Sequence, residues 1–284
     1  MFVVLRIHNS ETNKINRRQR KEINNSCVQP HSTEKGLPFF TLDVLETKKG
    51  IDWQAVSEKC GRYASRIVAP RNVTLPDGLG LNRFAHRSVL PILIFNTACR
   101  ELSSAKLPAD KISITVTDRN SVMYSQIQRL LPLASQIRVI TSKPEKYASA
   151  CVKAMEENGA TIMLRSAYEA VEGIEIVICC DGIISPAMQN SIIFACGKKS
   201  GGKLCFCGNG LELLPVHKAI IPENIEPIDF AGALFELCGC FTYCNSCFSK
   251  IEISCKKCEN RSVKECLQCV AKQLNSRHYS IYYI

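Results

Sequence analysis

The sequence predicts an α/β protein whose main domain is a doubly wound parallel sheet, with a small, mainly helical lobe before it. Between residues 112 and 210, five short apolar runs alternate with segments of helical periodicity. Strands that are apolar along their whole length are typical of a parallel sheet covered on both faces by helices. Because crossovers between parallel strands are right-handed, a doubly wound sheet is the simplest topology for this pattern.

Composition divides the 284 residues into four segments. Residues 1–36 carry seven Lys and Arg against three Glu and lack apolar periodicity, so we expect a disordered basic tail. Residues 37–108 are expected to form the helical lobe, and residues 109–238 the α/β domain. Residues 239–284 carry the same basic excess and are rich in cysteine, which marks them as a separate C-terminal segment.

The lobe is predicted to begin with a strand over Pro38–Val44 and to continue with two helices. Asp52 caps the first helix, in which apolar residues recur at steps of three and four until Pro70 ends it. The second helix is apolar and runs to Leu102.

The α/β domain is predicted to contain five strands: Ile112–Thr117, Ile137–Thr141, Thr161–Leu164, Ile174–Cys180 and Lys203–Cys207. Apolar spacing, proline at first helical positions and a closing glycine at 159 predict the helices between and after them. These helices are Ser121–Leu133, Pro144–Asn158, Ala167–Val171, Ser185–Gly197 and Pro227–Cys238.

Ligands of such a sheet bind beyond the carboxyl ends of its strands. The candidate ligand-binding residues therefore follow strands one, two, four and five: Asp118, Arg119, Asn120, Ser121, Ser142, Lys143, Asp181, Gly182, Gly208 and Gly210.

The turn after strand one has no glycine, from Thr117 to Ser121. Dinucleotide-binding folds place G-x-G-x-x-G there so that the backbone can approach a pyrophosphate. Asp118 would also repel a pyrophosphate, whereas the N-terminus of the following helix can offer amides to a smaller anion. The alternative role for Asp118 and Ser121 is helix capping.

Residues 111–210 resemble the NAD(P)-binding domain of the shikimate dehydrogenase and glutamyl-tRNA reductase type, which is Rossmann-like. The wider region 37–238 resembles clostridial proteins of uncharacterised function that contain a Rossmann-like half. In the dehydrogenase family, Ser or Thr with a nearby base after strand two selects NADP over NAD. Thr141, Ser142 and Lys143 are similar to that pattern, so the resemblance implies NADP as the cofactor.

The C-terminal segment repeats a Cys-x-x-Cys pair every eleven residues. Two such pairs complete a closed tetrahedral zinc site, and the candidate ligands are Cys244, Cys247, Cys255 and Cys258. The third pair, Cys266 and Cys269, lies in a stretch of helical periodicity and is equally explained by packing. An iron–sulfur cluster or free thiols are the alternatives to zinc.

Composition argues against membrane insertion and secretion and makes nucleic-acid binding the less favoured interpretation. No apolar run approaches the ~18 residues of a membrane-spanning helix, and Met1–Ile7 is too short for a signal peptide, so we expect a cytoplasmic protein. The net charge of +10 lies mostly in the two ends of the chain, where solvated tails are favoured over nucleic-acid binding.

Three functional hypotheses follow, and none of them assigns a reaction. The five histidines are scattered and indicate no nucleophile–base pair. The leading hypothesis is a nucleotide- or anion-binding protein with a degenerate Rossmann-like domain. The alternatives are an NADP-dependent oxidoreductase with an atypical phosphate loop and a zinc-stabilised interaction module.

Overall fold

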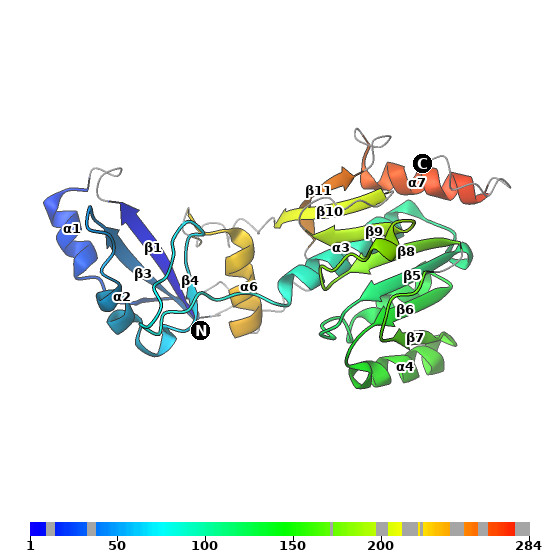
Figure 1. Cartoon of the computed structure of the whole chain (residues 1–284), viewed down its shortest axis with the longest axis horizontal. Coiled ribbons are helices and arrows are strands. Elements are labelled where there is room, and N and C mark those ends of the chain that lie inside the picture. Colours follow the sequence, from blue (N-terminus) through cyan, green and yellow to red (C-terminus); the bar gives the residue numbers. More distant parts are fainter. Residues whose placement is uncertain are drawn as a thin grey trace. The chain divides into compact units, whose positions relative to one another are not determined.

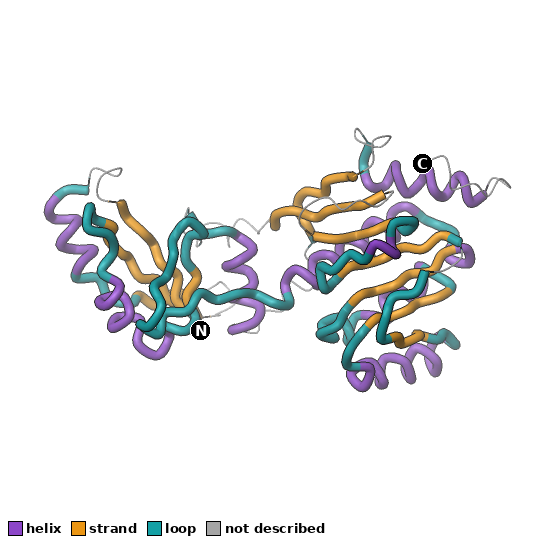
Figure 2. The backbone as a smooth tube through the Cα atoms, viewed as in Figure 1, coloured by secondary structure: helices purple, strands orange, loops and turns teal. Residues whose placement is uncertain are grey.

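In the computed structural model, the chain forms two compact units (Figures 1 and 2). The N-terminal unit comprises Met1–Val89 and Glu212–Tyr243, and the second unit comprises Leu90–Leu211 and Cys244–Ile284. The structure describes residues 1–9, 15–32, 38–170, 173–196, 204–211, 221, 224–238, 247–254 and 261–275.

The second unit is an α/β unit built on a seven-stranded sheet with the order β11-β10-β9-β8-β5-β6-β7. Neighbouring strands are parallel throughout, except that β11 is antiparallel to β10 at one edge. Without β11, the order is 3-2-1-4-5-6, as in dinucleotide-binding sheets. The predicted parallel α/β sheet is thus confirmed. The strands are β5 (Ile112–Thr117), β6 (Gln136–Ile140), β7 (Ile162–Arg165), β8 (Ile174–Cys179), β9 (Ile192–Cys196), β10 (Leu204–Leu211) and β11 (Phe248–Ser254).

Helices of the second unit partly follow the prediction. Two α-helices agree with it: α4 ends at Gly159 in the left-handed conformation, and α7 covers the periodic stretch that contains Cys266. The helices and 3-10 turns are α3 (Val89–Ala105), η2 (Ala109–Lys111), η3 (Ile127–Leu133), η4 (Pro144–Tyr147), α4 (Ala148–Asn158), η5 (Pro186–Met188) and α7 (Val263–Asn275).

Three predicted helices of this unit are wrong. In place of the expected helix Ala167–Val171, residues 167–170 form a bend and an irregular segment. Residues 121–126 form turns and only the 3-10 helix η3 follows, since Pro132 within it cannot donate a helical hydrogen bond. The expected helix from Ser185 to Gly197 is a single 3-10 turn followed by β9, a buried run of β-branched and aromatic residues that suits a strand.

The N-terminal unit contains a four-stranded sheet with the order β2-β3-β1-β4, in which β1 is parallel to both of its neighbours. The antiparallel strand β2 pairs with the other edge of β3. The elements of this unit are β1 (Val3–Asn9), α1 (Arg17–Asn24), β2 (Gln29–Ser32), β3 (Pro38–Glu46), α2 (Trp53–Cys60), η1 (Gly61–Tyr63), β4 (Ile67–Val68) and α6 (Pro227–Cys238).

The predicted disordered tail over residues 1–36 is therefore wrong. Phe2, Val3, Val4 and Leu5 are fully buried, because β1 is the central strand between β3 and β4. One short apolar run among polar residues has too weak a periodicity to be recognised alone. Tertiary pairing gives it a partner on both sides.

The other predicted domain boundaries also change. The lobe expected to be mainly helical over residues 37–108 contributes β3 and β4 to a sheet, while α3 begins where the chain enters the second unit. Helix α6, predicted as the end of the α/β domain, belongs to the N-terminal unit. Its Phe230 ring packs edge-on against Phe2 at 5.7 Å and against Phe39 at 5.2 Å between ring centroids. In the C-terminal segment, β11 and α7 belong to the second unit.

None of the helices in the described ranges is long and apolar enough to cross a membrane.

Candidate functional site

The candidate site lies at the carboxyl edge of the second unit's sheet, where the chain order reverses between β5 and β8. The backbone N–H of Asp118 donates to the carbonyl of Ile140 at 2.9 Å, and that of Asp181 donates to Thr117 at 3.2 Å. The Ser142 hydroxyl donates to the carbonyl of Arg119 at 2.7 Å. The turns after β5, β6 and β8 therefore meet, as expected from a parallel sheet.

Eight of the ten residues predicted to bind a ligand belong to these three turns. Arg119, Asn120, Ser142 and Lys143 are exposed, whereas Asp118 and Ser121 are buried. Asp181 is half-buried and is followed by the exposed Gly182, whose positive φ of 72° suits glycine. The exposed residues are the ones that a ligand can reach.

The Asp118 side chain stabilises the turn that follows β5. Its carboxylate accepts hydrogen bonds from the backbone N–H groups of Val122 at 2.9 Å and Met123 at 2.7 Å. It also accepts one from the Tyr147 hydroxyl at 2.5 Å, and burial with the nearby carboxylate raises the pKa of Tyr147 far above its ordinary value. The Asp118 carboxylate thus accepts from backbone N–H groups that would bind a phosphate in a glycine-rich loop.

Ser121 is the second structural residue of this turn. It adopts a left-handed φ of 57°, and its hydroxyl lies 2.9 Å from that of Thr141 and 3.3 Å from the carbonyl of Lys143. The capping role that sequence analysis left open is supported for Asp118, which caps a turn rather than an α-helix, whereas the Ser121 hydroxyl bonds to the turn after β6 and caps nothing. The helix N-terminus expected to offer amides to an anion does not form here.

We expect the substitution Asp118→Ala to lower the free energy of unfolding of the second unit by about 3 kcal/mol, because three buried donors lose a charged acceptor. Urea denaturation followed by far-ultraviolet circular dichroism measures this loss. Asn120→Ala, in the same turn but exposed, is the control and should change stability by less than about 0.5 kcal/mol. Equal stability of the two variants would contradict the structural role of Asp118.

Arg119 is positioned by the neighbouring turn. Its Nε lies 3.5 Å from Oδ2 of Asp181, and the other carboxylate oxygen, Oδ1, accepts from the Thr117 hydroxyl at 2.6 Å and from the backbone of Ile183 at 3.1 Å. Thr117 was not among the predicted site residues, although its place as the last residue of a strand could have indicated it. Together these contacts hold a guanidinium at the switch point while leaving it 59% exposed.

Gly208 and Gly210 were predicted to follow the last strand, and this prediction is wrong. Both lie within β10, which pairs with β11 on its outer side. A Cβ atom on Gly208 would lie 1.9 Å from the Phe248 ring, so this glycine makes room for a side chain of the neighbouring strand. The two glycines therefore belong to strand packing and not to the three turns.

The predicted zinc ligands are only partly within the described residues. Cys244, Cys255 and Cys258 lie outside them, and Cys247 is half-buried just before β11. Among the residues that the structure describes, no group of three or more His, Cys, Asp or Glu side chains could hold a metal ion.

Four cysteines in β10 and at the end of β8 are packing residues. Cys179, Cys180, Cys205 and Cys207 are at most 3% exposed. Burial raises the pKa of Cys179 to about 12 and that of Cys180 well above its ordinary value, so both are neutral thiols at pH 7. Cys266, in the third Cys-x-x-Cys pair, is buried on α7.

No protein-family model matches this sequence, and no curated protein matches it.

Proposed function

We propose that the second unit binds a nucleotide or another small anion at the switch point between β5 and β8. One observation carries the proposal: the exposed cations Arg119 and Lys143 stand on adjacent turns at the edge where open α/β sheets bind ligands. The Ser142 hydroxyl bonded to Arg119 ties these turns together.

The mode of binding would differ from that of a glycine-rich loop. Because Asp118 engages the amides of Val122 and Met123, an anionic group meets side chains rather than a backbone cradle. A guanidinium and an ammonium suit a phosphate, since both offer several charged N–H donors. The ligand we propose therefore places a phosphate or carboxylate outside the turn, beside Arg119 and Lys143.

An NADP-dependent oxidoreductase with an atypical phosphate loop is the second candidate. Ser142 and Lys143 lie in the turn after β6, where the resemblance to the dehydrogenase family places the residues that select NADP, and both are exposed. A 2′-phosphate bound by these two residues would not need the backbone N–H groups of Val122 and Met123, which already donate to Asp118. The zinc-stabilised module stays a prediction, since three of its four cysteines lie outside the described residues.

A titration with adenosine 2′-monophosphate, adenosine 5′-monophosphate, NAD and NADP tests both candidates by calorimetry and thermal shift. We expect at least one nucleotide to bind, and Arg119→Ala with Lys143→Ala to weaken its binding about tenfold, or about 1.4 kcal/mol. Lys153→Ala, an exposed lysine on α4 paired with Glu157, is the matched control.

The outcomes separate the two candidates. Binding of NADP at least about tenfold tighter than that of NAD would favour the oxidoreductase, since only the 2′-phosphate differs. No thermal shift at millimolar concentrations of any of the four compounds would contradict both. Binding that the double variant leaves unchanged would contradict the placement at this edge.

A further inference from the structure

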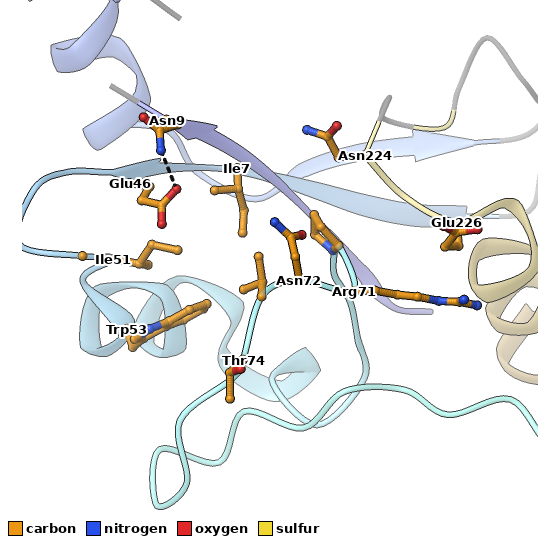
Figure 3. A pocket seen from close by; sticks show the side chains of 13 residues that line it. Ile7, Asn9, Glu46, Ile51, Trp53, Arg71, Asn72, Thr74, Asn224 and Glu226 are labelled. Atoms are coloured by element: carbon orange, nitrogen blue, oxygen red, sulfur yellow. Dashed lines mark hydrogen bonds between the residues drawn. The ribbon is translucent and has the colours of Figure 1, made fainter. Parts of the chain in front are cut away.

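The N-terminal unit has its own cavity at the carboxyl ends of parallel strands. A pocket of about 650 Å³ lies beyond the ends of β1, β3 and β4 (Figure 3). This volume is within the range of small-molecule sites, and the position is the one where α/β sheets bind ligands. Its polar lining includes Asn9, Glu46, Arg71, Asn72 and Glu226, and Trp53 contributes an aromatic ring.

The register of β1 and β3 brings two polar residues of the pocket lining, Asn9 and Glu46, side by side. Asn9 ends β1, Glu46 ends β3, and the two residues are direct partners across the parallel strands. The Asn9 side-chain amide donates to Oε2 of Glu46 at 3.0 Å. This hydrogen bond fixes one carboxylate oxygen and so orients the Glu46 side chain at the pocket wall.

Arg83 builds the wall that follows β4. Its guanidinium donates to the backbone carbonyls of Ala69 at 2.5 Å, Pro70 at 2.9 Å and Val73 at 2.5 Å. Three bonds from one planar group pin the loop that carries Asn72 and Thr74 into the pocket lining. Arg83 is thus a positioning residue of the pocket.

The charges of the pocket lining favour a cation. It carries two carboxylates, Glu46 and Glu226, against the guanidinium of Arg71. Nε of Arg71 lies 3.3 Å from Oδ2 of Asp229 on α6, and Figure 3 shows this side chain extending toward that helix. Burial opposes ionisation of Asp229, but hydrogen bonds from His86 and Arg71 outweigh it and lower the pKa of its carboxyl. The positive charge of Arg71 is therefore balanced by an ionised partner.

Trp53 supplies a second feature suited to a cation. In Figure 3 the indole lies at the same end of the pocket as Glu46, with Ile51 between them, and Asn224 and Glu226 lie at the opposite end. The face of an indole attracts an ammonium group, and the attraction is strongest where water is partly excluded. A carboxylate and an indole at one end of a pocket form a site for a protonated amine.

We propose that this pocket binds a small polar ligand that carries a protonated amine, with the ammonium group at the Glu46 carboxylate, in the end of the pocket that Trp53 also lines. Hydroxyl or carbonyl groups elsewhere on the ligand meet the amides of Asn72 and Asn224 and the hydroxyl of Thr74. The proposal concerns the N-terminal unit and does not depend on nucleotide binding by the second unit.

Trp53 makes the proposal directly testable, because it is the single tryptophan of the chain. The probes are two matched pairs, glucosamine with glucose and putrescine with 1,4-butanediol, in which one hydroxyl and two hydroxyls, respectively, are replaced by ammonium groups. Full-length protein is titrated at pH 6.5 while Trp53 fluorescence and ligand-observed NMR are recorded. We expect at least one amine to bind about tenfold tighter than its hydroxyl partner, since only the amine gains the charged contacts.

The variant Glu46→Gln keeps an oxygen that can accept from Asn9 and removes the charge, so we expect about a tenfold loss of amine affinity. Glu58→Gln on α2 removes the same charge from an exposed residue outside the pocket lining and should bind as the parent does. Should Glu46→Gln alter the thermal midpoint, Trp53→Leu tests the same end of the pocket by ligand-observed NMR, and we expect it to weaken amine binding. The proposal is overturned if neither amine gives a saturable signal, if both members of each pair bind equally, or if a folded Glu46→Gln protein binds as the parent does.

Discussion

Leu5→Asp is expected to unfold the N-terminal unit. Leu5 is fully buried in the central strand of that unit's sheet, opposite Leu42 of β3. Removal of a buried leucine side chain costs about 2–5 kcal/mol, and a buried carboxylate adds a desolvation penalty. Since whole domains are stable by about 5–15 kcal/mol, this single change should remove most of the unit's stability.

Urea denaturation followed by Trp53 fluorescence reports on this unit, because the only tryptophan lies in α2. The control is Asn24→Asp, which adds the same charge at an exposed position of α1 and should leave the transition nearly unchanged. If residues 1–36 were a disordered tail, the two variants would behave alike.

Glu175→Ala is expected to destabilise the second unit by about 3–5 kcal/mol, because it leaves Arg138 charged and buried without its partner. Glu175 on β8 is 4% exposed and forms an ion pair with Arg138 on β6, across the intervening β5. It also accepts hydrogen bonds from the hydroxyls of Thr115 at 2.6 Å and Ser191 at 2.8 Å, and from that of Tyr168. Removal of the Glu175 carboxylate therefore deprives four side chains of a hydrogen-bond acceptor.

Circular dichroism in urea measures this loss, and the Trp53 transition of the other unit serves as an internal reference. Glu157→Ala breaks an exposed pair with Lys153 and should cost about 0.5 kcal/mol or less. The double variant Arg138→Met with Glu175→Leu should be more stable than Glu175→Ala, because it leaves no unpaired buried charge. A double variant less stable than the single one would show that the network, and not the unpaired charge, controls stability.

Much of the second unit could be predicted because its strands are continuous apolar runs. β5 was predicted with its observed bounds, as was α6 of the N-terminal unit, since each pattern identifies one type of element. β9 and η3 could not be assigned correctly, because an apolar stretch between polar turns fits a strand or a helix equally well. In the C-terminal segment the cysteine spacing predicted a metal site, and the strand Phe248–Ser254 was not predicted.

The candidate site was predicted to the extent that it follows from strand ends. The sequence placed Arg119, Ser142, Lys143 and Asp181 directly after strands, and parallel pairing brings their turns together. It could not show that Asp118 turns inward to its own backbone, because that depends on the buried Tyr147 hydroxyl 29 residues away. The N-terminal pocket was missed entirely, since most of its lining residues lie in loops that have no periodic pattern.

The sequence by itself therefore determined that a parallel α/β sheet forms and which side chains stand at its carboxyl edge, since both depend on local apolar runs and their order. Only the tertiary structure decided that Val3–Asn9 form an inner strand, that α6 returns to the N-terminal unit and that Gly208 lies beneath Phe248. These features arise from partners distant in the chain. A short segment becomes ordered when the free energy of burial against such partners exceeds the entropic cost of fixing its backbone. That difference depends on distant residues and cannot be calculated from the local sequence.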